Sequence, residues 1–537
     1  MPLPRLFRRI FRISLRGLLA LMAVAAGVFA FWVKPSLDQR RAVEQMSALG
    51  TVFDYDFEAD REAEPGPEWL RETLGIDFLT DIVEVHVWDQ TRADLTPVKH
   101  FPKLETLCFY EVRVEGFEVV GDLKHLREVG ASYSGITSIE PLRQATGMIE
   151  LSLVGNDIES IDAVRGMTDL EILGLDETNV TDLSPITNCR WLRELGIART
   201  PIVDLRPIAG LVELRSFGAN QTSVADLTAL SGMTKMRTLW LSDTKVADLS
   251  PISGMRDLEK LWLSGTDISD VSPLAGMTKL VDLSIRNTRI SDPSPLASLT
   301  SLQDLGVGGG SFTTVDFARR LTALKELTLQ NTPIDDLSGL SNLEWLRHVH
   351  LIDLAATDIS SLADKPLRIV DIKRTPVQDI QVLSGLKDLK YVTLVGTQVR
   401  SLRPLANCTL SSLNVSDSPI ESLDGIPWKV LRELDLSGTD ITDFSPLKKM
   451  VRASELSLAR TSFADLNDLV AAKSVWDLNI SQTKVSDLSP IKRLGRLSWL
   501  DISGTEIADL SPLAKLPQLS ILKIAGTKIR DLSPLYG

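Results

Sequence analysis

The chain has 537 residues, and its 58 basic and 71 acidic side chains give a formal net charge of −13. This acidic balance argues against nonspecific binding to nucleic acid, and no interleaving of aromatic with basic residues offsets it. The three cysteines, Cys108, Cys189 and Cys408, lie far apart along the chain, so we expect no disulfide within it.

The N-terminal segment has the pattern of a membrane anchor. Five arginines lie between Arg5 and Arg16, and an uncharged run then extends from Gly17 to Val33, just before Lys34. As a helix this run is roughly 26 Å long, close to the thickness of a bilayer core. We predict that residues 1–34 form an Arg-rich cytoplasmic end and a single transmembrane signal anchor, with residues 17–33 in the membrane and everything after them on the extracytoplasmic side. A signal peptide cleaved after the sequence Ala-Val-Ala at 23–25 is the alternative, and both interpretations export the rest of the chain.

Residues 35–80 differ in pattern from all that follows. Residues 36–50 have helical spacing, 51–57 alternate as a strand does, a Pro-Gly-Pro break follows, and 68–74 suggest a short helix. We interpret the segment as an N-terminal cap of helix, strand and helix. Four acidic residues in it resemble a metal-binding loop, although a solvated strand face is favoured: Asp54, Asp56, Glu58 and Asp60.

From residue 81 to 537 the chain repeats one 22-residue unit, clearest in Leu258–Leu274, which reads LEKLWLSGTDISDVSPL. A Thr follows the strand in most copies and marks the register. We count 21 copies, whose landmark residues are Gln90, Val112, Ser134, Asn156, Thr178, Thr200, Thr222, Thr244, Thr266, Thr288, Gly310, Thr332, Thr357, Thr375, Thr397, Ser418, Thr439, Thr461, Thr483, Thr505 and Thr527.

The unit has a physical interpretation. Leu261 and Leu263 point to one side of a strand and Trp262 to the other, so equivalent strands stacked side by side form a parallel sheet over a continuous Leu core. The landmark Thr follows the strand, where its hydroxyl can bond backbone groups that have lost their ladder partners. The Ser-Pro pair at 250–251 fits a Ser N-cap with Pro at the first position of a short 3₁₀ or single-turn helix.

These residues resemble the 22-residue class of leucine-rich repeat, best known in internalin-like bacterial surface proteins and in a regulatory subunit of a eukaryotic protein phosphatase. The resemblance implies a repeat solenoid of α/β type, a horseshoe with a parallel sheet on its concave face and short 3₁₀ turns on its convex face. It also implies protein binding on the concave sheet, without naming a partner. The chain departs from the family by placing Thr where Asn normally forms the ladder, and only Asn156 keeps Asn.

The array is disturbed between residues 306 and 366. Gly-rich sequence at 306–310 precedes a unit that lacks the Asp-Leu-Ser-Pro-Leu segment. With Thr357 as landmark, three residues are inserted after Leu351 and the next interval, to Thr375, shortens to 18. Such irregularity marks either a functional site or drift at a tolerant position, with drift favoured.

No nucleophile and base, phosphate loop or metal cluster stands out, so we predict no catalysis, no cofactor, no metal and no small-molecule substrate. His348 and His350 share a strand face with Asp353 nearby, although solvated surface is the favoured interpretation. Outward acidic positions near the C-terminus form either a cation or basic-partner site or, as favoured, a solvated face: Glu433, Asp435, Glu455, Asp477 and Asp501.

The candidate recognition surface is an aromatic pair with polar surroundings. Trp240 and Trp262 occupy the same outward position in adjacent repeats, and their polar neighbours are Thr238, Ser242, Lys260, Asp282 and Arg286. This composition is typical of an interface hot spot, although the pair also fits simple stacking on each other. A second aromatic group either shares this role or packs against the cap: His86, Trp88, Tyr110 and Tyr133.

The sequence therefore predicts a membrane-anchored, exported leucine-rich repeat protein that binds another protein on its concave sheet. The alternative is a structural scaffold of the cell envelope without one specific ligand.

Overall fold

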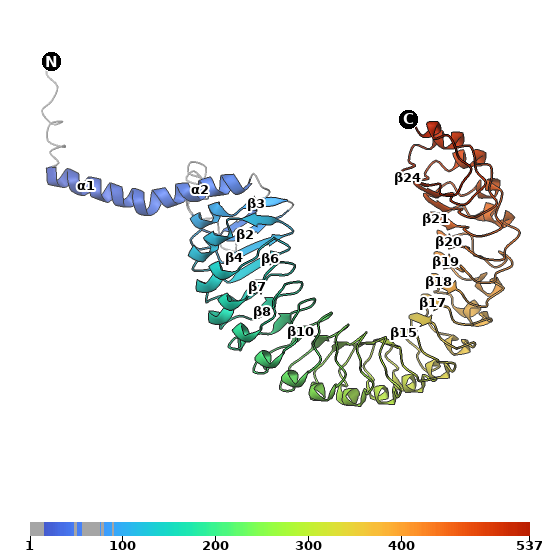
Figure 1. Cartoon of the computed structure of the whole chain (residues 1–537), viewed down its shortest axis with the longest axis horizontal. Helices are drawn as coiled ribbons and strands as arrows, with labels where there is room; N and C mark the ends of the chain where they lie inside the picture. The colour runs from blue at the N-terminus through green and yellow to red at the C-terminus, as the bar shows by residue number, and fades with distance from the viewer. Residues whose placement is uncertain (1–14, 48–50, 56–75, 77–79, 89–90, 537) are drawn as a thin grey trace, which may run out of the picture. The chain divides into compact units, whose positions relative to one another are not determined.

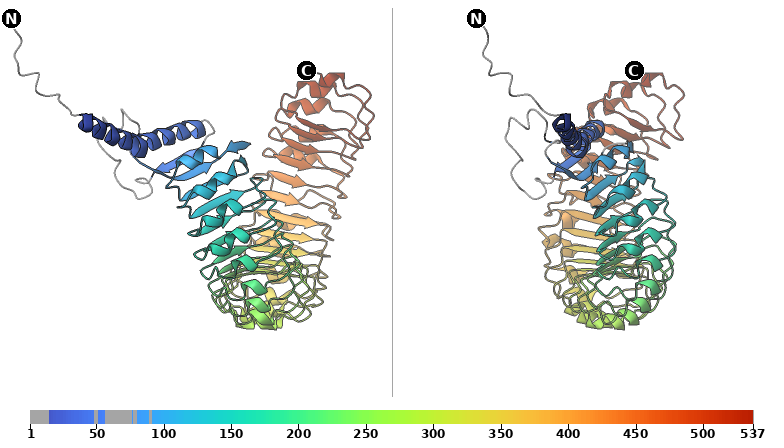
Figure 2. Two further views of the ribbon diagram at one scale, coloured as in Figure 1. Left: turned by 60° about the vertical axis from the view of Figure 1, so that its left-hand side comes forward. Right: turned by 90° about the vertical axis from the view of Figure 1, so that its left-hand side faces the viewer.

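The computed structural model of the protein describes residues 15–47, 51–55, 76, 80–88 and 91–536. The chain forms two compact units, residues 1–236 and residues 237–537. In each unit the strands lie along one side and short 3₁₀ segments along the other (Figures 1 and 2).

A long helix opens the first unit. Helix α1 (Leu15–Val28), a π-helical turn η1 (Phe29–Val33) and α2 (Lys34–Ser47) follow one another without a break (Figure 1). Among the described residues, Leu21–Ser47 is the one helix long and apolar enough to cross a membrane, judged by length and composition alone. Its first half exposes apolar side chains, with Phe31 88% exposed, whereas α2 buries Ala42 and Met46.

Helix α2 and strand β1 (Val52–Tyr55) cover the start of the repeats. The amide of Gln39 on α2 donates to the backbone oxygen of Thr80 at 2.8 Å. Strand β1 pairs antiparallel with β2 (Ile82–Val87), and Phe53 on β1 meets Phe101 edge to face at 6.0 Å. The helix predicted at 36–50 and the strand predicted at 51–57 are thus α2 and β1. The helix predicted at 68–74 lies outside the described residues, and the domain boundaries at 34 and 80 stay predictions.

The other sheet strands of the first unit are parallel and paired in chain order. Strands β3 (Arg92–Asp94) and β5 (Arg113–Glu115), from the first repeats, form a separate two-stranded parallel sheet. The parallel strands after β2 are β4 (Thr106–Tyr110), β6 (Glu128–Ser132), β7 (Glu150–Ser152), β8 (Ile172–Gly174), β9 (Glu194–Gly196) and β10 (Ser216–Gly218).

The second unit continues the same pattern, and the described residues contain one parallel strand for each of the 21 repeats, seven in the first unit and 14 in the second. The predicted leucine-rich repeat solenoid is confirmed. The strands of the second unit are β11 (Thr238–Trp240), β12 (Lys260–Trp262), β13 (Asp282–Ile285), β14 (Asp304–Gly308), β15 (Glu326–Gln330), β16 (His348–Ile352), β17 (Ile369–Lys373), β18 (Tyr391–Val395), β19 (Ser412–Asn414), β20 (Glu433–Asp435), β21 (Glu455–Ser457), β22 (Asp477–Asn479), β23 (Trp499–Asp501) and β24 (Ile521–Lys523).

The core follows from strand alternation. Leu261 and Leu263 are fully buried, and the equivalent residues are buried along each unit except in the last repeat, where Leu522 and Ile524 are half-buried; the intervening side chains face outward. On the opposite side, Ser250–Ile252 forms the predicted 3₁₀ turn. The predicted Ser N-cap is wrong, because Leu249 holds the N-cap position and the carboxylate of Asp248 accepts from the Ser250 backbone N–H at 2.8 Å.

Most of the described landmark Thr residues are buried, and most of their hydroxyls bond the backbone, as predicted. The Thr266 hydroxyl donates to the Leu263 backbone oxygen at 2.6 Å, three residues earlier in its own repeat. Asn156 reaches farther: its side-chain oxygen accepts from the backbone N–H groups of Ser134 and Ile136 in the preceding repeat, at 3.1 and 3.0 Å. Thr266 therefore closes its own turn, whereas Asn156 also links neighbouring repeats.

The expected insertion near residue 357 is absent, because the landmark there is Leu354. Leu354 is buried and follows Asp353, whose φ of +54° is the turn conformation that precedes most landmarks, whereas Thr357 is exposed. The interval from Thr332 is thus 22, and the next, to Thr375, is 21 residues. Strand pairing agrees, since His348 lies opposite Ile369. Choosing a Thr over an apolar residue caused the error.

Candidate functional site

The candidate site lies on the outward face of β11 to β15, within the second unit. Consecutive strands are in register, so outward side chains form rows that cross the sheet. We call two of them the acidic row and the tryptophan row. The acidic row starts with Thr238 and continues through Lys260, Asp282, Asp304 and Glu326; the tryptophan row is Trp240, Trp262, Ser284, Gly306 and Thr328.

The two tryptophans touch each other. Trp240 pairs with Trp262 in register, and their rings meet edge to face, with centroids 6.1 Å apart and an interplanar angle of 71°. Trp262 remains 38% exposed, and Trp240 is half-buried. The pair therefore has both features expected from the sequence: mutual contact and an aromatic surface open to solvent.

A hollow of about 370 Å³ opens beside Trp262. Of the predicted site residues, Trp262, Asp282 and Arg286 line it, whereas Trp240, Lys260 and Thr238 lie outside its lining. The remaining lining residues include Ser242, Asp243, Ser264, Ser284, Asp304, Gly306, Glu326 and Thr328.

Gly306 helps to form this hollow by lacking a side chain. It stands in the tryptophan row two strands after Trp262, and a Cβ there would come within 3.1 Å of Arg286 Cδ. A larger residue would both enter the hollow and displace the arginine stem. The glycine is therefore a site residue that the search for outward aromatic pairs missed.

The acidic row gives the hollow its charge. Asp282, Asp304 and Glu326 lie opposite one another on β13, β14 and β15. Burial raises the pKa of Asp304, and the neighbouring charges of Glu326 and Asp282 raise it further. Asp304 and Glu326 were not predicted as site residues, although stepping 22 residues on from Asp282 reaches both.

Two basic side chains near the acidic row are available to bind an acidic group of a partner. In the second unit as described, neither Lys260 nor Arg286 forms an ion pair. The Nε–H of Arg286 donates to the Ser284 hydroxyl at 3.2 Å, and its backbone N–H donates to the Ser264 hydroxyl at 3.2 Å. Ser284 of the tryptophan row and Ser264 thus hold Arg286 over the hollow.

Comparison with known proteins identifies the fold family. The family profile described as Leucine Rich repeats (2 copies) matches residues 234–276 and 256–298, which include β11, β12 and β13. The chain has a leucine-rich repeat fold. The 22-residue period of the stacked strands is the period of the predicted internalin-like class. No curated protein sequence matches the chain.

Three solved structures illustrate what the leucine-rich repeat protein resembles. A Leptospira interrogans leucine-rich repeat protein, LIC12759, is 19% identical, with a TM-score of 0.53 and coverage of 76% of this chain and 98% of its own. The Arabidopsis receptor kinase HAESA, in complex with the peptide hormone IDA and the co-receptor SERK1, is 20% identical, with a TM-score of 0.55 and coverage of 73% and 72%. Internalin InlF from Listeria monocytogenes is 25% identical, with a TM-score of 0.46 and coverage of 74% and 91%.

The two histidines of β16 contact carboxylates on the neighbouring strands. His348 and His350 do share the outward face of β16, but Asp353 forms a two-point ion pair with Arg374 instead. His350 Nδ1 lies 3.2 Å from Asp371. Asp353 lies past the end of β16, in the turn that follows the strand, and so pairs with Arg374 rather than with either histidine.

His348 Nδ1 lies 3.3 Å from Glu326, so the pair links β16 to the acidic row. Lys373 also contacts Asp371, at 2.9 Å. Hydrogen bonds from His350 and Lys373 outweigh the burial of Asp371 and hold its pKa below the usual range.

The C-terminal acidic face forms a second hollow, of about 360 Å³, lined in part by Glu433, Glu455 and Asp477. Burial raises the pKa of Glu455, with contributions from Glu433 and Asp477, and burial also raises the pKa of Asp477. Asp435 also lines this hollow, whereas Asp501 does not. Each of these two carboxylates accepts from the backbone N–H two residues further on.

The second aromatic group splits into two pairs in the first unit. His86 stacks parallel to Trp88 with centroids 5.8 Å apart, and Tyr110 meets Tyr133 edge to face at 6.0 Å. His86 also lies opposite Val52 of β1, so part of the group contacts the cap strand.

Proposed function

We propose that this chain is a membrane-anchored, exported leucine-rich repeat protein that binds another protein through the outward face of β11 to β15 and has no catalytic activity of its own. The observation that carries the proposal is the hollow beside the Trp240 and Trp262 pair, where an exposed aromatic surface meets three carboxylates and Arg286, which forms no ion pair with the described residues; Lys260 lies just outside the lining. Leucine-rich repeat proteins in general bind protein ligands on this face.

The chemistry of the hollow points to a partner that presents a basic side chain next to an apolar one. Asp282, Asp304 and Glu326 repel one another on neighbouring strands, so a Lys or Arg entering the hollow relieves that repulsion. Trp262 offers the apolar contact at the rim. Lys260 and Arg286 restrict the orientation, because each attracts a carboxylate of the partner and repels a second cation.

The membrane anchor is supported by two features of the same end of the chain. Arginines cluster before residue 17, and apolar side chains at Leu21, Met22, Phe29 and Phe31 are exposed on a continuous helix. Such exposure is expected for a helix that lies in lipid. With the Arg-rich end in the cytoplasm, the repeats are extracytoplasmic.

The direct test is capture of a partner from intact cells by the full-length protein, followed by affinity measurement with purified partner. The double variant Trp240→Ala, Trp262→Ala should bind the partner more weakly by more than about 2 kcal/mol, roughly 30-fold in affinity, as expected for a hot spot. Trp345→Ala is the matched control, because Trp345 is 59% exposed but lies in the turn before β16 rather than on the sheet face.

Two outcomes would contradict the proposal. A double variant that binds its partner as tightly as wild type would show that the tryptophan pair is not the contact surface. Absence of any saturable partner would instead favour a scaffold that organises the cell envelope.

A further inference from the structure

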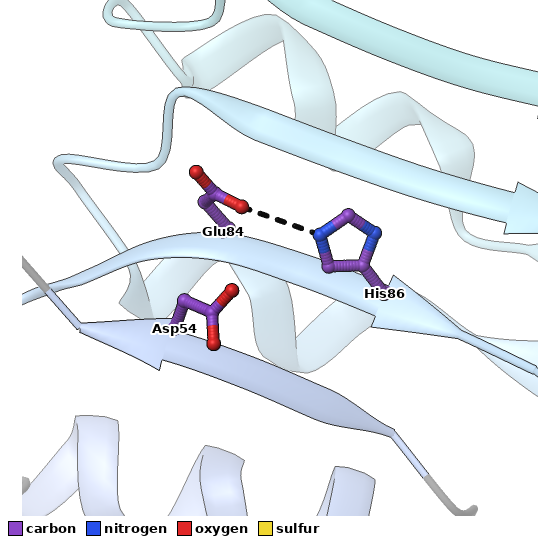
Figure 3. A group of neighbouring side chains, drawn as sticks. All are labelled: Asp54, Glu84 and His86. Carbon is purple, nitrogen blue, oxygen red and sulfur yellow. Dashed lines mark hydrogen bonds and ion pairs between the residues drawn. The ribbon is translucent and has the colours of Figure 1, made fainter. Parts of the chain in front are cut away.

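The junction between the cap strand and the first repeat brings together three potential metal ligands. Asp54 lies on β1 directly opposite Glu84 on β2, and His86 follows two residues later on the same face of β2. Figure 3 shows the carboxylates of Asp54 and Glu84 and the imidazole of His86 on one side of this antiparallel pair. A solvated strand face was favoured for Asp54, and its side chain is half-buried beside the exposed Val52; Asp56, Glu58 and Asp60 lie outside the described residues.

The spacing of these groups fits coordination better than hydrogen bonding. One ligand atom from each residue lies within 4.8 Å of the other two. His86 Nε2 and Glu84 Oε2 are 3.4 Å apart, longer than the roughly 2.7 to 3.2 Å of ordinary N–H···O bonds. Two ligands bound to one tetrahedral Zn²⁺ at about 2.1 Å are separated by roughly 3.4 Å, so this pair already has the required spacing.

His86 is also poorly satisfied as an isolated side chain. Its Nδ1 is buried and has no hydrogen-bond partner in the part of the chain that the structure describes, so the long contact to Glu84 is its only polar one there. The Trp88 ring stacks parallel to the imidazole and fixes its plane, which orients Nε2 toward the two carboxylates.

The charges of the group are uncompensated by the protein. Within the described ranges, neither Asp54 nor Glu84 forms an ion pair with Lys or Arg, and the one charged contact is that between Glu84 and His86. Two carboxylates on directly opposed strand positions repel each other. A divalent cation between them would remove this repulsion.

Cys108 lies opposite His86 on β4 but does not complete the ligand set. Its thiol contacts Glu128 at 3.6 Å, away from Asp54 and Glu84. Burial and the charge of Glu128 raise the pKa of Cys108 to about 12, which disfavours the thiolate that metals bind.

We propose that Asp54, Glu84 and His86 form a binding site for a divalent transition-metal ion, with Zn²⁺ as the best fit, that fastens the cap strand to the first repeat. One imidazole nitrogen and two carboxylate oxygens are ligands that Zn²⁺ accepts, whereas Ca²⁺ takes six to eight oxygens. Because Asp54 belongs to β1 and the other two ligands belong to β2, a bound ion ties the two strands together. The site is separate from the proposed partner surface on β11 to β15.

The test is calorimetric titration of Zn²⁺ into the untagged, full-length protein in detergent after removal of metals with a chelator. Wild type should bind one ion per chain at micromolar concentration. Asp54→Asn, Glu84→Gln and His86→Gln should each weaken binding at least tenfold. His348→Gln is the matched control: His348 contacts Glu326 on the neighbouring strand at 3.3 Å, the same kind of pair without a third ligand, and this variant should bind as wild type does.

Hydrogen exchange of the wild-type protein gives a second measurement that needs no variant to fold. Zn²⁺ should slow exchange of the β1 amides at Val52–Tyr55 and leave those of β23 at Trp499–Asp501 unchanged. Absence of Zn²⁺ binding up to about 1 mM would overturn the proposal, as would Asp54→Asn and His86→Gln variants that bind like wild type, or an unchanged exchange rate of β1.

Discussion

The buried Thr row allows a comparison between two positions that are alike in sequence and burial but different in hydrogen bonding. Thr266 and Thr332 are both 4% exposed and both occupy the landmark position. The hydroxyl of Thr266 donates to the Leu263 backbone oxygen at 2.6 Å, whereas among the described residues the hydroxyl of Thr332 has no partner. We predict that the same substitution, Thr→Val, has opposite consequences at the two sites.

Val preserves the shape of Thr and removes only the hydroxyl. At Thr266 this leaves a buried carbonyl without its donor, so the free energy of unfolding should fall by roughly 1 to 3 kcal/mol. At Thr332 no bond is lost and an unpaired buried hydroxyl disappears, so stability should stay the same or rise by a few tenths of a kcal/mol.

Urea unfolding followed by tryptophan fluorescence measures this difference, because Trp262 adjoins Leu263. The urea concentration at the unfolding midpoint should fall for Thr266→Val, with the denaturant dependence of the free energy unchanged. For Thr332→Val the midpoint should stay at the wild-type value or rise slightly. Thr266→Asn should lose less than Thr266→Val, since Asn can bond the neighbouring repeat as Asn156 does. Equal midpoints for wild type and Thr266→Val, or an equal loss at both positions, would refute the role assigned to the hydroxyl.

Four further outcomes follow from the structure. In a double-mutant cycle on unfolding, Trp240→Ala and Trp262→Ala should show a coupling of about 0.5 to 1.5 kcal/mol from their edge-to-face contact, and independent effects would contradict it. The pKa of Asp304 is raised in the folded state, so its contribution to stability is complete below the unfolded pKa and is lost as pH rises through the folded pKa. The Asp304→Asn variant should therefore be more stable than wild type at pH 7, by roughly 0.2 to 1 kcal/mol, and equally stable at pH 3. Thermal unfolding at the two pH values measures this difference. The Gly306→Val variant should fold and should bind the partner more weakly, because the valine side chain fills the hollow. Unchanged affinity would place the partner elsewhere. Protease added to spheroplasts should digest the chain after Lys34, and protected repeats would reverse the predicted topology.

Periodicity predicted the parts of the molecule that every repeat shares. Alternation in Leu261-Trp262-Leu263 gave the strand, the buried face and the outward tryptophan, and each is present. This succeeds because a solenoid satisfies each unit through its immediate neighbours, so local pattern and tertiary environment coincide.

The pattern failed where one residue type substitutes for another in the same role. Leu354 replaces a landmark Thr, so selecting the nearest Thr, at 357, displaced the register by three residues. Likewise the carboxylate of Asp248, rather than the predicted hydroxyl of Ser250, bonds the start of the 3₁₀ turn. In both cases backbone geometry defines the position, and chemically different side chains satisfy it.

The hollow and the metal-ligand cluster were beyond reach of the repeat pattern for two physical reasons. The hollow exists because Gly306 lacks a side chain beside Arg286, and a repeat consensus records what recurs rather than what one unit omits. The cluster joins Asp54 to Glu84 across an antiparallel pairing that occurs once, outside the parallel array, so no period relates them. Both candidate sites therefore arise where the chain departs from its own repeat, while the regular units supply the rigid spacing that holds the departing side chains in place.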